Sequence, residues 1–486
     1  MHFDITSESG GRSVLPLIQC IERFGWLSGL RELDLRLDVS GPTQPGDWTT
    51  HGFSKIVHWV IFSWIDRNRL KKLTVHGVNY RKLIEALAHA TETWPSRDRA
   101  LSLRSLILIN KLKASKIHRS HCLTEGDLHT IMKSLPGLER LWLGVCFETS
   151  CRMMYPWPAS VQGPDFGRVG LSLTALYIED PQMLLEYYFI LKACPNLEAA
   201  NIGLTVDGED ALVMVSVSLP QAAVTVECKR LNELVLRVIP ADYQPGYDVL
   251  YVFDGLYLPR LEKLSLSWSS DGPTLDPWDL TPMNDEQFIS RFPSLAHISI
   301  FSSPRHAQIP DLTPLLTAAR FTTSLTLHIP HEAMVDTLRY YLQLGDRPFL
   351  NFRTLKLQIT SLSLDMSWII GTRAQSRMRI LATTLREFIR RCCFTPSAQH
   401  VVPSGDASNS NLSSLESVEV CFETCGNTVD MNPKINYHVE SCYQGLLEEF
   451  KGESVPGLHI SFCQGSLVPS SLDDDPFEEM FRSRYF

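Results

Sequence analysis

The sequence has no long hydrophobic run, no excess of basic residues and no signal peptide at its start. The most apolar short stretch, residues 56–65, has about half the ~20 residues that a membrane-spanning helix needs, and it contains His58. A net charge of −9 disfavours a general nucleic-acid binder, which needs a basic surface. We therefore expect a cytoplasmic or nuclear protein, with neither nucleic acid nor a membrane as its partner.

Motifs that carry catalysis or hold cofactors are also absent. There is no glycine-rich nucleotide loop and no Gly-x-Ser-x-Gly elbow, and His331-Glu332 lacks the second histidine of a zincin helix. His118, His121 and Cys122 have the ligand types for zinc, but no second pair completes a four-ligand site. We expect no enzyme activity, cofactor or metal, and we read the twelve cysteines as buried thiols.

What the sequence does contain is a repeated phrase, Leu-x-x-Leu-x-Leu, first at residues 27–35 and most cleanly at 135–143. Self-similarity of this kind is typical of a solenoid. The aliphatic residues that open the short strands form the series Leu33, Leu73, Leu106, Leu141, Leu176, Ala200, Leu234, Leu264, Ile298, Leu355 and Val418. This pattern predicts an α/β fold, an irregular leucine-rich-repeat solenoid (horseshoe) with parallel strands on the concave face and helices on the convex face.

Segments with helical spacing separate these strands. We expect helices over residues 53–66 and 181–194, and a third capped by Thr124. A long helix over 373–394 and a mobile linker over 396–414 interrupt the repeats, so that the interval from Leu355 to Val418 holds more than one ordinary repeat. Residues 151–167 and 271–282 are expected to be loops. The predicted organisation is an N-terminal cap (1–26), a solenoid (27–465) and an acidic C-terminal tail (466–486).

Several repeats share the phrase Pro-x-Leu, as in Pro136-Gly137-Leu138, Pro195-Asn196-Leu197, Pro259-Arg260-Leu261 and Pro293-Ser294-Leu295. In this respect residues 15–465 resemble the divergent leucine-rich repeats of fungal F-box proteins. The resemblance implies repeats that select a protein target, as in substrate adaptors of cullin ubiquitin ligases. The first repeat begins by Leu27, which leaves no room for an F-box after Met1. A Skp-type adaptor is therefore expected as a partner only if an F-box lies upstream, and a stand-alone scaffold is the alternative.

In such a fold the side chains that flank the buried aliphatic residues point away from the core, where a partner is read. Neighbouring strands lie about 5 Å apart, so side chains from consecutive repeats form one patch. Aromatic residues and arginine in such a patch are typical of binding hot spots. The predicted partner-binding patch consists of Ile107, Ile109, Arg140, Trp142, Tyr177 and Glu179. A loop covering the patch, such as 151–167, is the alternative.

Three charged segments give further alternatives. A basic cluster between Lys111 and Arg119 is interpreted as solvated surface, with an acidic partner as the alternative. The arginines of the predicted helix 373–394 face water or, in a second reading, an anionic membrane. Acidic residues from Asp473 to Glu479 are expected to be disordered or to fold back on either basic segment.

Overall fold

The chain forms two compact units in the computed structural model. The structure describes residues 2–6, 31–38, 70–76, 80–93, 103–109, 123–145, 170–206, 226–240, 256–268, 290–302, 322–343, 353–360, 372–393, 415–425, 459–467 and 476–486, with the single positions Arg23, Phe253 and Glu448. Unit 1 comprises residues 1–205, 212–231 and 480–486, and unit 2 comprises 206–211 and 232–479. The predicted boundaries at residues 26 and 465 stay predictions.

Parallel strands in chain order build the sheet of each unit. In unit 1 they are β1 (His2–Thr6), β2 (Glu32–Asp38), β3 (Lys72–His76), β4 (Ser105–Ile109), β5 (Arg140–Gly144), β6 (Ala175–Met183) and β7 (Ala199–Val206). In unit 2 they are β9 (Glu233–Pro240), β11 (Lys263–Trp268), β12 (His297–Ser302), β13 (Ser324–Pro330), β14 (Thr354–Thr360), β15 (Ser417–Cys425) and β16 (His459–Leu467). Two-residue strands β8 (Val226–Glu227) and β10 (Leu256–Tyr257) lie outside these runs. The expectation of an α/β protein with parallel strands is confirmed.

The predicted series of aliphatic markers coincides with the register of the strands. In unit 1, Leu33 pairs with Leu73, and the same row continues through Leu106, Leu141, Leu176 and Ala200. In unit 2 the row from Leu234 to Val418 includes Leu325 of β13, which the sequence series omits. All these side chains are buried, and each buried leucine contributes roughly 1.5–3 kcal/mol.

A recurring pair of hydrogen bonds joins ten of the described strands to the strand before them. The carbonyl two residues before a marker accepts two successive backbone amides from the next repeat, at 2.7–3.1 Å. In unit 1 the accepting residues are Arg31, Lys71, Arg104, Glu139 and Thr174, and in unit 2 they are Asn232, Glu262, Ala296, Thr323 and Arg353. Both amides at the start of each strand are thereby satisfied, and the register of the row is fixed.

The Pro-x-Leu phrases form tight turns that lead into the strands. In each phrase the leucine amide donates to the carbonyl three residues earlier, at 2.9–3.1 Å, with proline at the second position, where its fixed φ suits a turn. Side chains connect one turn to its neighbour: Asn196 donates to the Leu171 carbonyl at 2.6 Å, and Ser294 donates to the Pro259 carbonyl at 2.7 Å. The phrase therefore builds both the turn and its contact with the adjacent repeat.

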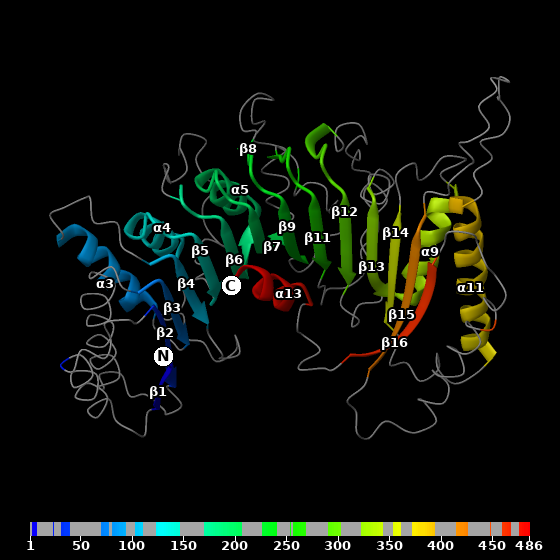
Figure 1. Ribbon diagram of the computed structural model, residues 1–486, viewed down its shortest axis with the longest axis horizontal. Helices are drawn as coiled ribbons and strands as arrows, with labels where there is room; N and C mark the ends of the chain where they lie inside the picture. Colours follow the sequence, from blue (N-terminus) through cyan, green and yellow to red (C-terminus); the bar gives the residue numbers. More distant parts are fainter. Residues whose placement is uncertain are drawn as a thin grey trace. The chain divides into compact units, whose positions relative to one another are not determined.

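Helices join several strands and bury their aliphatic sides (Figure 1). They are α3 (Tyr80–Thr93), α4 (Glu125–Ser134) and α5 (Leu184–Ala193) in unit 1, and α9 (His331–Gln343) and α11 (Thr372–Cys393) in unit 2. The cap at Thr124 is confirmed: its hydroxyl accepts from the Asp127 amide at 3.2 Å, and the Asp127 carboxylate accepts from the Thr124 amide at 2.7 Å. The helix predicted from residue 181 begins at Leu184, because β6 extends through Met183.

The long predicted helix corresponds to α11, which packs against α9 through buried Leu381, Leu385, Phe388 and Ile389. Strand β14 pairs directly with β15, so the long interval between them adds a helix to the repeat and no intervening strand of the sheet. The predicted helix 53–66, the loops 151–167 and 271–282 and the linker 396–414 lie outside the described residues. Among the helices that are described, none is long and apolar enough to cross a bilayer.

The predicted acidic tail contains a helix, α13 (Pro476–Tyr485). Its residues from Met480 onward belong to unit 1, together with Phe486. Figure 1 shows α13 beside the strands and apart from α4 and α5. The expectation of disorder for the acidic run 473–479 is therefore wrong for residues 476–479, which are helical. The ring and cation contacts that residues 481–486 make with the strands lie on the predicted patch.

Candidate interaction surface

The middle of the predicted patch is a row of side chains that runs across five strands of unit 1. Thr74 of β3, Ile107 of β4, Trp142 of β5, Tyr177 of β6 and Asn201 of β7 are consecutive register partners. We call these five residues the central row. They alternate with the aliphatic markers along each strand, so they lie on the opposite face of the sheet. The sequence therefore grouped Ile107, Trp142 and Tyr177 correctly.

The aromatic members of the row form a tight stack. The rings of Trp142 and Tyr177 have centroids 3.6 Å apart and planes 7° from parallel. Adjacent strands lie about 5 Å apart, so pairing of Trp142 with Tyr177 in the register brings the two rings within reach of each other. Gly144, two residues beyond Trp142, leaves space beside the stack: a Cβ there would lie 3.1 Å from Trp142 Nε1 and 2.9 Å from Glu179 Oε2.

The predicted exposure of the row is wrong. Ile107, Trp142 and Tyr177 are only 4%, 2% and 0% exposed. The segment seen to contact the aromatic pair is residues 481–486, at the end of α13. The loop 151–167, which the sequence suggested as a cover, lies outside the described residues. At the margins of the patch Ile109 is half-buried, while Arg140 and Glu179 are exposed.

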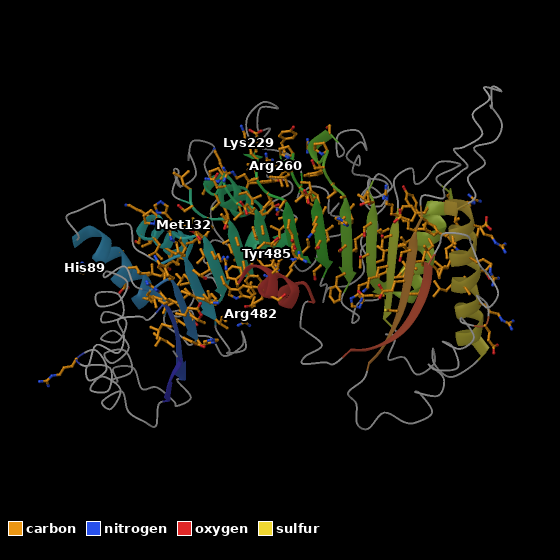
Figure 2. All side chains as sticks on the ribbon, viewed as in Figure 1. His89, Met132, Lys229, Arg260, Arg482 and Tyr485 are labelled. Atoms are coloured by element: carbon orange, nitrogen blue, oxygen red, sulfur yellow. The ribbon has the colours of Figure 1, made fainter. Side chains whose placement is uncertain are left out.

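The contacts of this segment involve rings, a cation and one backbone oxygen. Phe486 meets the Trp142 ring edge-on at 5.1 Å between centroids, and Phe481 lies 6.4 Å from the Tyr177 ring. The Arg482 guanidinium carbon is 5.7 Å from the centre of the Trp142 ring. Lys72 Nζ donates to the Phe486 carbonyl oxygen at 2.7 Å. Figure 2 labels Arg482 and Tyr485 on α13, among the side chains of nearby strands.

A local sequence signal for this helix exists. Asp475-Pro476-Phe477-Glu478 places an N-cap residue before a proline in the first turn, with glutamate at the third helical position. Arg482 and Arg484 fall in the last turn, where cations interact favourably with the helix dipole. The acidic composition of the segment obscured this pattern. Its docking on Trp142 has no local signal, because it depends on residues more than three hundred positions away.

No protein-family model matches the chain, and no curated protein is similar enough to count as a relative. Rings, a lysine and an arginine at the margin suit recognition of a peptide, and they offer no nucleophile paired with a base.

The metal and thiol candidates have different outcomes. His118, His121 and Cys122 lie outside the described residues, as does the basic cluster from Lys111 to Arg119. Within the described part of the chain, no three His, Cys, Asp or Glu residues gather as metal ligands.

Among the cysteines, Cys194 and Cys228 of unit 1 are free and buried, and burial raises the pKa of each thiol to about 12. Such thiols are inert core residues. Cys421 of β15 is disulfide-bonded, so the expectation of a reduced thiol is wrong there.

Proposed function

We propose that this chain is a protein-interaction scaffold, an irregular leucine-rich-repeat solenoid similar to the target-selecting repeats of fungal F-box proteins. One observation carries the proposal: the central row already holds a helical segment through rings and charged groups. A face that accepts one amphipathic helix has the shape and chemistry to accept another. The recurring carbonyl hydrogen bonds and Pro-x-Leu turns support the repeat architecture.

A link to ubiquitin ligation is a narrower form of this proposal. The resemblance of the Pro-x-Leu phrases to F-box proteins supports it, while the stand-alone scaffold needs no adaptor. Purifying the full chain from cells and probing for a Skp-type adaptor separates the two forms. Stoichiometric recovery of the adaptor supports a ligase subunit, and its absence leaves the scaffold without a ubiquitin role. A cytoplasmic or nuclear location stays a prediction.

The alternative of a membrane scaffold has less physical support. Insertion into a bilayer interface requires an apolar helix face that is free to leave water. In α11 the side chains of Leu381, Leu385 and Phe388 are buried, and the helix packs on α9. Arg391 donates to Glu387 and to the Leu342 carbonyl of α9. The described part of this helix therefore directs its apolar side into the protein. We accordingly favour partner binding by the surface of unit 1 over membrane binding by α11.

The margin of the patch provides the test of the interaction role. Arg140 and Glu179 are exposed, so Arg140→Glu with Glu179→Arg reverses both charges without opening the core. Arg230→Glu, at another exposed position of unit 1, is the matched control. Affinity purification of the three chains from cells is expected to recover a protein with the wild type and the control, and at least fivefold less of it with the double variant. Equal recovery of all proteins with the three chains would contradict the proposal.

A further inference from the structure

Residues 481–486 lie against Trp142 and Tyr177 of the central row, although the chain that precedes this segment, from 232 to 479, forms the other unit. Within unit 1 they bury Phe481 to 1% exposure and place Phe486 against Trp142. The last turn is helical, since the Phe486 amide donates to the Arg482 carbonyl at 3.0 Å. A short helix of the chain itself therefore contacts the side chains to which we propose that a partner binds.

Along the end of this helix, burial is concentrated in one side chain. Phe481 is its fully buried side chain among residues 481–486, whereas Arg482, Ser483 and Arg484 are exposed. A helix of ten residues is marginal by itself in water, so α13 depends on the face that it covers. A tethered segment acts at an effective concentration on the order of millimolar, which compensates for weak contacts. A free partner in solution therefore needs a higher affinity or a higher concentration than an untethered copy of the segment would need.

We propose that the end of α13 with Phe486, residues 480–486 of unit 1, is an intramolecular competitor that occupies the partner site and restricts access to it. This inference rests on the proposed interaction function and identifies the partner class: a short amphipathic helix with an aromatic anchor followed by a basic residue. Phe481 and Arg482 supply this pair in the chain itself. The anchor ring lies 6.4 Å from the Tyr177 ring at a tilt of 40°, and the cation lies over the Trp142 ring; both contacts are of kinds that stabilise a bound side chain.

Lys72 favours one direction of the bound helix over the other. Its ammonium group donates to the Phe486 carbonyl, at the end of the helix where unsatisfied carbonyls carry partial negative charge. A partner helix bound in the same direction would place its last turn at Lys72. A helix in the opposite direction would present amide groups to the ammonium, which is unfavourable. The surface therefore selects orientation as well as sequence.

The test uses a fluorescent peptide with the sequence of residues 473–486 as the probe. Fluorescence anisotropy measures its affinity for the full-length wild type and for full-length Phe481→Asp/Phe486→Asp, in which two introduced charges release the tail. Arg230→Asp is the matched control for added charge on unit 1. Circular dichroism and thermal melting verify that each variant is folded. We expect micromolar binding to the released variant, and binding at least ~10-fold weaker to the wild type and the control, because the tether competes.

The site of binding is tested in the released variant. Adding Trp142→Ala is expected to weaken peptide binding at least ~10-fold, and Lys72→Met, which leaves the ring stack in place, provides a second variant if the first fails to fold. Equal affinity for wild type and released variant would show that the tail restricts nothing, while leaving the face as a binding surface. No binding to a folded released variant would also overturn the inference. The purification with Arg140→Glu/Glu179→Arg tests the interaction function independently of both results.

Discussion

Trp142 and Tyr177 stack face to face from adjacent strands, and Phe486 makes a T-shaped contact with Trp142. The two strand residues therefore act as one apolar surface on which the tail rests. A change to either ring affects the packing of the row and the position of the tail together.

Replacing Trp142 is expected to destabilise the protein. Trp142→Ala removes a ring that is 2% exposed, and truncation of a buried aromatic side chain costs about 3–5 kcal/mol. Trp142→Phe keeps a ring on Tyr177 and should cost less. Urea denaturation monitored by circular dichroism measures both. Arg140→Ala on the same strand is the control, since its side chain is exposed and a change within about 0.5 kcal/mol is expected. Equal stability of Trp142→Ala and Arg140→Ala would argue against the buried stack.

Two glycine substitutions should have opposite effects. A Cβ at Gly144 would lie 3.1 Å from Trp142 Nε1, and the stacked ring cannot easily move, so Gly144→Ala is expected to cost about 1–3 kcal/mol. At Gly126 in α4, a Cβ would be 3.6 Å from Thr124 Oγ1, which is an ordinary contact. Gly126→Ala is expected to be neutral or to stabilise by up to about 1 kcal/mol through helix propensity. Thermal melting of both variants measures which is the less stable. A Gly144→Ala protein more stable than the Gly126→Ala protein would contradict the prediction.

The capping box of α4 gives a third prediction. Thr124→Ala removes the acceptor of the Asp127 amide and is expected to lower the free energy of unfolding by about 1 kcal/mol. Thr130→Ala is the matched control on the same helix, because the Thr130 hydroxyl is exposed and donates to the Gly126 carbonyl within the helix. Alanine there should leave stability unchanged or slightly higher. Chemical denaturation of the two variants distinguishes loss of the N-cap hydrogen bond from the effect of replacing any threonine of this segment by alanine.

Alkaline pH should weaken the folded state through the buried thiols. Burial raises the pKa of Cys194 and of Cys228 from 9.0 to about 12, so the folded protein keeps both protons while the unfolded chain releases them. The stabilisation is complete below pH 9 and is lost as the pH rises toward 12, at up to about 1.4 kcal/mol per pH unit for each thiol.

The variant Cys194→Ala/Cys228→Ala should show a shallower decline between pH 9 and pH 10. Burial also raises the pKa of Tyr187 above its ordinary value of 10.0, but Tyr187 is present in both proteins and therefore does not account for a difference between them. Urea titrations at several pH values measure the slope. Maleimide labelling followed by peptide mass spectrometry provides a second measurement: both thiols should react after unfolding and stay unlabelled in the native protein at pH 8. Rapid native labelling would contradict the burial.

Sequence periodicity predicted the strands better than it predicted their surroundings. Alternation of aliphatic residues is a local property, and every marker from Leu33 to Val418 lies in the predicted row. Leu325 was missed although its strand has the same alternation, with Leu325, Leu327 and Ile329 at every second position. The burial of Trp142 was missed because its cover comes from the far end of the chain. Alternation within a strand follows from neighbours in sequence, whereas the covering of a face follows from tertiary contacts.

The carbonyl that accepts two amides from the next strand bears on how the protein tolerates insertions between strands. Each repeat requires only that an accepting carbonyl stands two residues before a buried aliphatic side chain, as at Arg353 and Leu355. The stretch between consecutive strands is not constrained by that rule, and the 22-residue α11 occupies one such stretch without shifting the pairing of Thr354 with Ser417. Foreign segments grafted between strands should therefore be accepted, which makes the chain a candidate backbone for building new binding loops.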